Sequence, residues 1–356
     1  MHDMTYYIHR QGSAMLQALG SRRETCASFV RMWAEHRPDR LYLVGSGTSG
    51  NAVRASAGFM EKTLGVETTA VSPTSLPKTI KGRPMFIYVS QGGKSTNTLK
   101  AIETMRAYPG IALTGEADCA INTACGSFVK LDCEHEDAGP KTMGYTGTIL
   151  TLYMMALEAA LHTQIISDAA YGEHIALLTQ MAEAMDENVA ATEAWYALNE
   201  DKLKKAALYL IVGIDEGCAV AQEAALKIQE TTLRGAIGFE YEEYLHGPIA
   251  MLYEAPVGIY LHPAVETQDS RRMDQLMEIH RGFGDRVYAV RCAQHSAVTA
   301  DSLVLRATEQ EWLAPFWQIL PSQVIGARLP GAIGTEGKLH ELFVAVDKAV
   351  SIKHKG

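Results

Sequence analysis

The segment RLYLVGSGTSG, residues 40–50, decides the fold class of this chain. Its first part, Arg40–Val44, is an apolar run that predicts a buried strand. A glycine-rich turn, Gly45–Gly50, follows at once, and residues 51–64 then predict a helix. Because a strand, a glycine turn and a helix in this order begin a βαβ unit, the segment indicates an α/β protein with a parallel sheet.

Apolar runs continue this sheet at intervals that suit parallel strands. They predict strands at residues 66–71, 85–89, 110–114 and 128–131. A further helical segment begins near Thr142. Residues 1–38 predict two short helices, and residues 160–205 predict long amphipathic helical sequence without a strand signal.

The second half of the chain repeats the pattern of the first. The strand and turn LYLIVG at residues 208–213 echo LYLVG at residues 41–45, and residues 258–261 echo residues 86–89. The order is kept, which favours a duplicated unit. We therefore predict two doubly wound parallel-sheet halves joined by a helical connector. The predicted limits are an N-terminal helical segment at 1–38, a first domain at 39–160, a connector at 161–204 and a second domain at 205–356.

Length, charge and cysteine content restrict the class of protein. The 356 residues exceed one typical domain, and the formal net charge of −9 disfavours nucleic acid as a partner. No uncharged apolar run is long enough to span a membrane, and the N-terminus lacks a signal-peptide pattern. The six cysteines show no CxxC pair, so neither disulfides nor a metal site is expected. We predict a cytoplasmic protein that uses no cofactor.

A second informative segment is EAALKIQETTLRGAIGFEYEEYLHGP, residues 223–248. Its first part predicts a helix, because alanine, leucine and glutamine favour helix, and Gly235 and Gly238 are expected to end it. A short turn then leads to His246, whose backbone is fixed by the glycine and proline that follow.

Glu223, Lys227 and Glu230 have a spacing that places all three on one face of this helix. Together with the imidazole of His246, two carboxylates and an ammonium group could move protons on a small substrate. The alternative is an ordinary glutamate–lysine surface pair and a turn histidine. This segment taken alone favours the alternative.

Two loops could bind phosphate. The glycines at 45, 47 and 50 match the GxGxxG dinucleotide fingerprint, and Glu67 lies about where a ribose-binding acid would be. The second loop, Ser90–Thr98, offers hydroxyls beside the bare backbone amides of two glycines. Hydroxyls and amides at a helix N-terminus suit a phosphate monoester. A sugar phosphate is therefore favoured, while a nucleotide or a serine-rich helix cap without a ligand stays open.

Three motifs together carry a family resemblance: Gly-Thr-Ser at 47–49, Ser-Gln at 90–91 followed by Ser-Thr, and His-Gly-Pro at 246–248. With the spacing between Glu230 and His246, they make residues 7–352 resemble a double sugar isomerase (SIS) domain protein. The chain is similar to the isomerase half of glutamine–fructose-6-phosphate aminotransferase and to the deglycases of amino-acid-modified sugar 6-phosphates. The resemblance implies the flavodoxin-like SIS fold for both halves.

The resemblance implies roles for single residues. Glu230 resembles the base that shuttles a proton, His246 the ring-opening group, and Lys348 the tail lysine that approaches the sugar carbonyl. Lys227 resembles a substrate-contacting lysine, and Lys141 stands in a pattern similar to that of the deglycases. The substrate-binding positions around the phosphate are Gly47, Thr48, Ser49, Ser90, Gln91, Gly92 and Ser95. Where the family has Ser-Gln-Ser, the third position is a glycine here and supplies only its amide.

No glutaminase domain precedes residue 40 and no cysteine follows Met1, so nitrogen transfer from glutamine is not expected of this chain. The resemblance implies a deglycase that cleaves an amino-acid–hexose 6-phosphate, such as fructoselysine or glucoselysine 6-phosphate, through an enolamine. The alternatives are an aldose–ketose isomerase or glucosamine-6-phosphate deaminase with the same residues, and a non-catalytic phosphosugar-binding regulator. The resemblance also implies at least a homodimer, in which His246 reaches the site of a neighbouring subunit.

Overall fold

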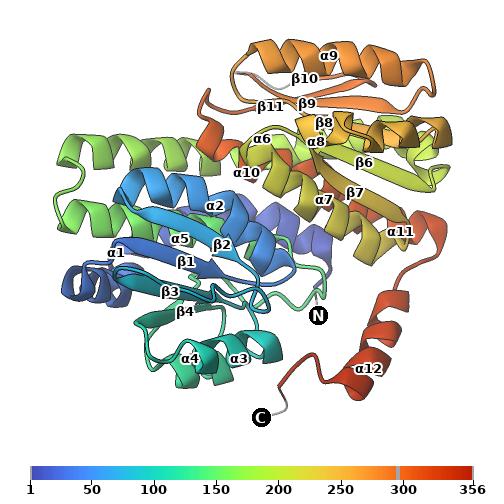
Figure 1. The fold of residues 1–356 in the computed structure, drawn as a ribbon. Helices are drawn as coiled ribbons and strands as arrows, with labels where there is room; N and C mark the ends of the chain where they lie inside the picture. Colours follow the sequence, from blue (N-terminus) through green and yellow to red (C-terminus); the bar gives the residue numbers. More distant parts are fainter. Residues whose placement is uncertain (1, 294–296, 355–356) are drawn as a thin grey trace. The chain divides into compact units, whose positions relative to one another are not determined.

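The computed structural model describes residues 2–293 and 297–354 of the chain (Figure 1). These residues form two compact units, and each unit takes its residues from several stretches of sequence. The first-sheet unit holds the described residues of 13–137, 143–179 and 341–356, and the second-sheet unit holds those of 1–12, 138–142 and 180–340. The four domain ranges expected from the sequence stay a prediction.

The first-sheet unit is built on a five-stranded parallel sheet in the order β2-β1-β3-β4-β5. Its strands are β1 (Arg40–Val44), β2 (Glu67–Val71), β3 (Pro84–Val89), β4 (Gly110–Thr114) and β5 (Phe128–Lys130). This order is that of a flavodoxin-like doubly wound sheet, so the α/β prediction is confirmed. β3 is central and buried along its whole length, which explains its uninterrupted apolar sequence.

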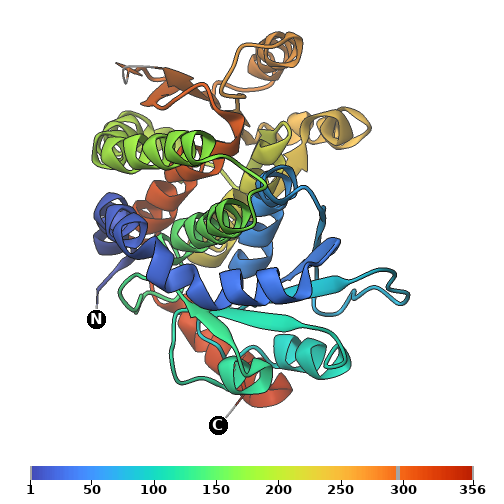
Figure 2. The ribbon, with the colours of Figure 1, turned by 90° about the vertical axis from the view of Figure 1, so that its left-hand side faces the viewer.

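Helices cover both faces of the first sheet. One face packs on α3 (Thr96–Thr104) and α4 (Ala120–Cys125) through a cluster of buried residues that includes Tyr42, Phe86 and Ile102. Figures 1 and 2 show α2 (Thr48–Leu64) and α5 (Met143–His162) on the opposite side of the sheet. α5 is buried along nearly its whole length, as expected of a core helix.

The second-sheet unit repeats this topology. Its six-stranded sheet has the order β10-β11-β9-β8-β6-β7, in which every pair is parallel except β10 with β11. The strands are β6 (Leu208–Gly213), β7 (Gly235–Glu240), β8 (Val257–Leu261), β9 (Val287–Ala293), β10 (Ala297–Val298) and β11 (Ser302–Arg306). Without the short antiparallel β10, the order is the same as in the first sheet. The prediction of two doubly wound halves is confirmed.

The remaining helices surround or connect the sheets. They are α1 (Met4–His36), α6 (Asp168–Lys204), α7 (Glu216–Thr232), α8 (Tyr241–Leu245), α9 (Gln268–Arg281), α10 (Ala314–Gln318), α11 (Leu320–Ile333) and α12 (Lys338–Val350), with 3₁₀ turns η1 (Pro248–Glu254) and η2 (Glu311–Leu313). Among the described residues, no helix has the length and apolar character needed to cross a membrane.

The prediction of two short N-terminal helices is wrong, because α1 is one continuous helix. Its sequence contains no proline, and only two glycines weaken it. A Cβ atom at Gly12 would lie 2.9 Å from the carbonyl oxygen of Ala182, so this glycine permits close packing against α6.

The prediction of a short turn after the 223–232 helix is also wrong. α7 ends at Thr232, the next residue Leu233 takes the left-handed conformation with φ 57°, and residues 235–240 form β7. A Cβ atom at Gly238 would overlap the carbonyl oxygen of Ala221, so only glycine lets β7 pass so close to α7. The two glycines that were expected to end the helix thus belong to an edge strand.

Candidate functional site

The glycine turn after β1 brings backbone amides to the start of α2. A Cβ atom at Gly45 would lie 2.8 Å from the carbonyl carbon of Ser49, and Gly47 has φ 56°. Glycine is therefore required for the tight turn and for the left-handed position. Thr48 and Ser49 lie in the first turn of α2, and the N-terminus of a helix favours the binding of an anion.

The Ser90–Thr98 loop follows β3 and leads into α3, as the glycine turn follows β1 and leads into α2. The carbonyl oxygen of Ser90 accepts a hydrogen bond from the amide of Gly93 at 2.9 Å, and Gly93 has φ 61°. Gly92 is exposed, and a Cβ atom there would have no neighbour within 4 Å. Ser95 is the N-cap of α3, but its side chain makes no capping hydrogen bond, and the amide of Thr96 in the first turn donates to the carbonyl oxygen of Ile352 at 3.3 Å instead.

Asn97 joins the two loops. Its side-chain amide donates to the hydroxyl of Ser46 at 2.8 Å, and its carbonyl oxygen accepts a hydrogen bond from the hydroxyl of Ser95. The loops follow β1 and β3, the adjacent central strands at which the chain changes direction across the sheet. Ligands of open α/β sheets bind at this switch point. Sequence analysis did not single out Asn97, since nothing local indicates a partner 51 positions away.

Gln91 is turned toward α5. A Cβ atom at Gly144 would overlap the side-chain amide of Gln91, so this amide lies against the backbone of the first turn of α5. The carbonyl oxygen of Gln91 accepts a hydrogen bond from the amide of Gly115 at 2.8 Å. These contacts hold the loop in place, and the expected part of Gln91 in substrate binding stays a prediction.

The position of Glu67 weakens the dinucleotide alternative. Glu67 is the first residue of β2 and lies beside Arg40, the first residue of β1, with a guanidinium–carboxylate distance of 3.5 Å. It therefore lies at the amino ends of the strands, whereas the glycine turn is at the carboxyl ends. A ribose-binding acid would need to be at the end that carries the turn.

The predicted proton-transfer residues lie together on α7. The ammonium group of Lys227 is 3.2 Å from the carboxylate of Glu223 and forms an ion pair with Glu230. Lys227 and Glu223 are 1% and 0% exposed, whereas Glu230 is 18% exposed. Burial acts to lower the pKa of Lys227, but the two carboxylates outweigh it and raise the pKa above its ordinary value. Glu230 is thus the carboxylate that a solute can reach, and Lys227 fixes its position.

His246 is exposed and follows the last residue of α8. Gly247 after it has φ 136°, which favours glycine, and Pro248 starts η1. Tyr241 and Tyr244, on the turn that leads to His246, are buried in the core of the second-sheet unit. The aromatic residues of this turn are therefore explained by the fold and give no support for a subunit interface.

The structure brings together the predicted residues in two groups. The first-sheet unit holds the phosphate-binding positions of both loops, and it also holds Lys348, an exposed residue on α12. The second-sheet unit holds Glu230, Lys227, His246 and Lys141. The ammonium group of Lys141 donates to the carbonyl oxygen of Ala138 at 3.0 Å.

The switch point of the second sheet differs in charge from the first. Asp215 and Glu216 follow β6, and no serine- and glycine-rich loop follows β8. Glu311, whose carboxylate accepts a hydrogen bond from the amide of Val265 at 3.0 Å, has a pKa raised by burial and by these two acids. An acidic switch point disfavours a phosphate group, so the features that predict phosphate binding lie at the first sheet.

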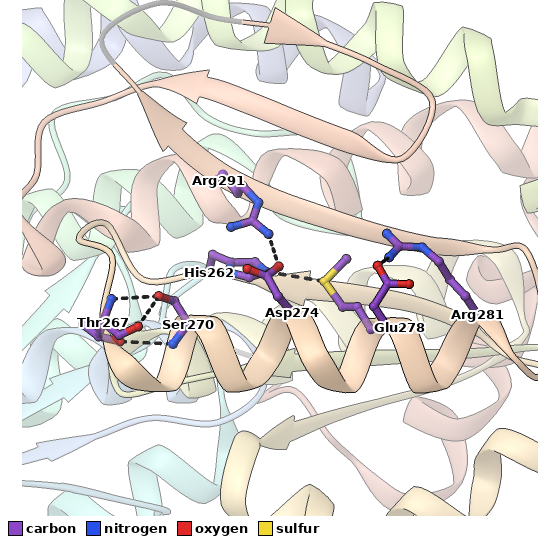
Figure 3. A network of polar contacts seen from close by, with 8 residues as sticks. His262, Thr267, Ser270, Asp274, Glu278, Arg281 and Arg291 are labelled. Carbon is purple, nitrogen blue, oxygen red and sulfur yellow. Dashed lines mark hydrogen bonds and ion pairs between the residues drawn. The ribbon is translucent and has the colours of Figure 1, made fainter.

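Figure 3 shows a polar network on α9 that sequence analysis did not anticipate. Asp274 pairs with Arg291 and lies 3.7 Å from the imidazole of His262, whose pKa burial lowers to about 3. Glu278 pairs with Arg281. These two ion pairs line a cavity of about 360 Å³. Because each of these arginines already has a carboxylate partner, the network offers no free guanidinium for a phosphate. It ties α9 to β9.

Comparison with known proteins finds no matching protein-family model. The chain is 25% identical over 292 residues to glutamine–fructose-6-phosphate aminotransferase (isomerizing) from Oceanobacillus iheyensis, which covers 81% of this chain and 48% of that protein. It thus spans about half the length of the curated relatives it matches. The chain resembles these aminotransferases in sequence.

Solved structures share the fold. A Clostridium difficile 630 protein provisionally named a phosphosugar isomerase superimposes with a TM-score of 0.86 at 21% identity, covering 96% of this chain and 98% of that chain. The C-terminal domain of glucosamine-fructose-6-phosphate aminotransferase from Francisella tularensis gives 0.79 at 15% identity, covering 94% and 97%. The chain therefore shares its fold with this C-terminal domain, and the expected SIS fold is confirmed.

Proposed function

From this resemblance to the aminotransferases, and from the fold shared with the isomerase structures, we propose that the chain is a phosphosugar deglycase. Its substrate is an amino-acid–hexose 6-phosphate of the fructoselysine or glucoselysine 6-phosphate type. The products are the free amino acid and a hexose 6-phosphate. The partly exposed carboxylate of Glu230, paired with the buried Lys227, is the observation that carries the proposal, because it supplies a positioned base.

The phosphate group binds at the two loops of the first sheet. The amides of the first turn of α2, with the hydroxyls of Ser49, Ser90 and Ser95, lie at the switch point. Ser90 directly follows β3 and is 8% exposed, and in this proposal its hydroxyl binds the phosphate. Binding at this point fixes the sugar at the end remote from the bond that breaks.

The chemistry is a proton transfer followed by hydrolysis. His246 assists opening of the sugar ring, and Glu230 takes a proton from the carbon that becomes the carbonyl carbon of the product. The resulting enolamine is protonated on the neighbouring carbon, which gives an imine. Water adds to the imine, and the carbon–nitrogen bond breaks to release the amino acid. Lys227 and Lys141 contact the substrate in this proposal, and Lys348 approaches the sugar carbonyl.

Two other functions use the same residues or fewer of them. An aldose–ketose isomerase would stop after proton transfer, and a glucosamine-6-phosphate deaminase would release ammonia instead of an amino acid. A regulator would bind the phosphosugar without turning it over. The ion-paired Glu230 favours an enzyme over a regulator, because a binding protein needs no carboxylate held in this way.

A substrate panel tests the proposal. The chain is incubated with fructoselysine 6-phosphate, glucoselysine 6-phosphate, fructose 6-phosphate and glucosamine 6-phosphate. Free lysine, ammonia and the hexose 6-phosphates are then measured by mass spectrometry. The proposal predicts free lysine in equal amount to a hexose 6-phosphate from one or both lysine conjugates. Release of ammonia only, interconversion of hexose 6-phosphates only, or binding without any product would each replace the deglycase by one of the alternatives.

A further inference from the structure

The last described residues of the chain, 351–354, form a tail that lies along the Ser90–Thr98 loop within the first-sheet unit. The amide of Thr96 donates to the carbonyl oxygen of Ile352 at 3.3 Å, and the amide of His354 donates to the carbonyl oxygen of Lys94 at 2.8 Å. The hydroxyl of Thr96 also donates to Ile352 at 2.8 Å. Figure 1 shows the tail after α12 running toward α3. The tail and the loop therefore form a short antiparallel bridge.

Ser95 and Lys353 are the directly opposed residues of this bridge. The two hydrogen bonds flank the pair and join its neighbours, which is the pattern of a non-hydrogen-bonded antiparallel pair. In such a pair the Cα atoms are about 4.5 Å apart and both side chains leave on the same face. The side chain of Lys353 therefore starts beside the hydroxyl of Ser95, one of the proposed phosphate-binding groups.

The turn before Lys353 is fixed by Asp347. The carbonyl oxygen of Asp347 accepts a hydrogen bond from the amide of Ser351 at 2.9 Å, and its carboxylate accepts one from the amide of Lys353 at 2.9 Å. Ser351 has φ 51°, so the chain reverses its direction here. Asp347 binds the backbone of Lys353, and in the part of the chain that the structure describes the ammonium group makes no ion pair.

The positive charge of Lys353 could assist the binding of a phosphate. The chain carries a formal net charge of −9, so a phosphate dianion needs local positive charge to bind. The proposed site otherwise consists of amides and hydroxyls, and its one lysine, Lys94, precedes Ser95 in the exposed part of the loop. An ammonium group on the face of the bridge that carries the Ser95 side chain would supply a charge-assisted hydrogen bond to a phosphate oxygen.

We propose that Lys353 is a phosphate-binding residue, and that residues 351–354 form one wall of the phosphate site. The proposal rests on the proposed function, since it assumes that the Ser90–Thr98 loop binds the phosphate of a sugar 6-phosphate. Lys353 contributes to ground-state binding and takes no part in proton transfer, because the phosphate is remote from the reacting carbons.

The test measures the dissociation constant of glucose 6-phosphate by calorimetry at two salt concentrations. Lys353→Gln is compared with Lys353→Arg, with Ser95→Ala and with Lys100→Gln, in which an exposed lysine of α3 is changed. Lys353→Gln should raise the dissociation constant roughly tenfold or more, the loss of one charge-assisted hydrogen bond, and reduce its salt dependence. Lys353→Arg and Lys100→Gln should bind within about twofold of the unchanged chain.

Two results would overturn the proposal in different ways. If Ser95→Ala weakens binding while Lys353→Gln binds as the unchanged chain does, the phosphate site stands and the role of Lys353 is wrong. If the unchanged chain binds neither glucose 6-phosphate nor an amino-acid–hexose 6-phosphate, the proposed function fails and the role of Lys353 fails with it. For an active chain, Lys353→Gln should raise KM and leave kcat nearly unchanged.

Discussion

Lys227 is buried between two carboxylates, and the energetics of that arrangement are testable. Lys227→Met leaves Glu223 and Glu230 close to each other without a cation. Removing one partner of a buried ionic group costs about 3–5 kcal/mol, so the free energy of unfolding should fall by roughly that amount in urea titrations. The double variant Glu223→Gln/Lys227→Met should recover part of the loss. An unchanged stability for Lys227→Met would contradict the ion-pair arrangement.

His280 gives the second-sheet unit a dependence on pH. Its imidazole Nε2 donates to the carbonyl oxygen of Pro256 at 3.3 Å, and its Nδ1 accepts from the hydroxyl of Tyr260 at 3.0 Å. Burial lowers the pKa of His280 to about 4, whereas an unfolded histidine has a pKa of about 6.5. Between these values the unfolded chain binds the extra proton, so stability should fall as the pH drops from 6.5 toward 4.

Urea unfolding at pH 7.0 and pH 4.5 measures this effect. The contribution of His280 to the pH-dependent loss is at most on the order of 3 kcal/mol. His280→Gln keeps a donor for Pro256 but cannot titrate, so its stability should change less between the two pH values. An equal change for both proteins would mean that His280 is not the group that responds.

At the scale of elements, strands buried on both faces could be predicted from their sequences. β1, β3 and β4 are uninterrupted apolar runs, and the predicted limits differ from the observed ones by no more than a residue. β7 could not be predicted, because Gly235 and Gly238 carry the signal of a chain break. β7 needs glycine because it lies against the backbone of α7. The local sequence gives no sign of that contact.

Gly238→Ala tests this explanation of β7. The new methyl group would overlap the backbone of Ala221, which is not a flexible side chain, so β7 and α7 must separate. Overpacking of this kind typically costs 1–3 kcal/mol, and the melting temperature should fall accordingly. Gly235→Ala, in the same strand, meets the flexible side chain of Leu208 at 3.3 Å and the carbonyl oxygen of Ala207 at an ordinary contact distance of 3.6 Å, so it should be tolerated better. Equal effects of the two substitutions would argue against close packing as the reason for Gly238.

The candidate site divides in the same way into predictable and unpredictable parts. The spacing of Glu223, Lys227 and Glu230 on a helix was sufficient to place them together, because helical periodicity is local. Two other contacts join distant parts of the chain. They are the hydrogen bond from Asn97 to Ser46 and the pairing of residues 351–354 with the Ser90–Thr98 loop. Their partners are fixed by tertiary structure, so sequence patterns could not reveal them.

At the scale of the whole molecule, the two sheets have the same strand order, which supports the duplication inferred from sequence echoes. The compact units were not predicted, because each is assembled from separate stretches of the chain. Three helices, α1, α6 and α12, each contribute residues to both units. The helical periodicity of α6 carries no mark of the position at which the contacts change.

The shared-site dimer stays a prediction and has a direct test. Inactive Glu230→Gln and His246→Ala proteins are mixed under conditions of subunit exchange. If each site takes Glu230 from one subunit and His246 from its neighbour, a mixed dimer has one intact site. Activity should then return to roughly a quarter of that of the unchanged protein, since about half the dimers are mixed. No recovery despite verified exchange would place both residues in the same subunit's site.

The central claim is that Glu230 moves the proton that precedes release of the amino acid. The most direct measurement is the rate of lysine release from fructoselysine or glucoselysine 6-phosphate by Glu230→Gln, with Glu254→Gln, an exposed glutamate of η1, as the matched control. A general base contributes about 10²–10⁴ in rate, so kcat for Glu230→Gln should fall by at least 10²-fold while the control keeps its activity. Release of lysine by Glu230→Gln at nearly the unchanged rate would contradict the account.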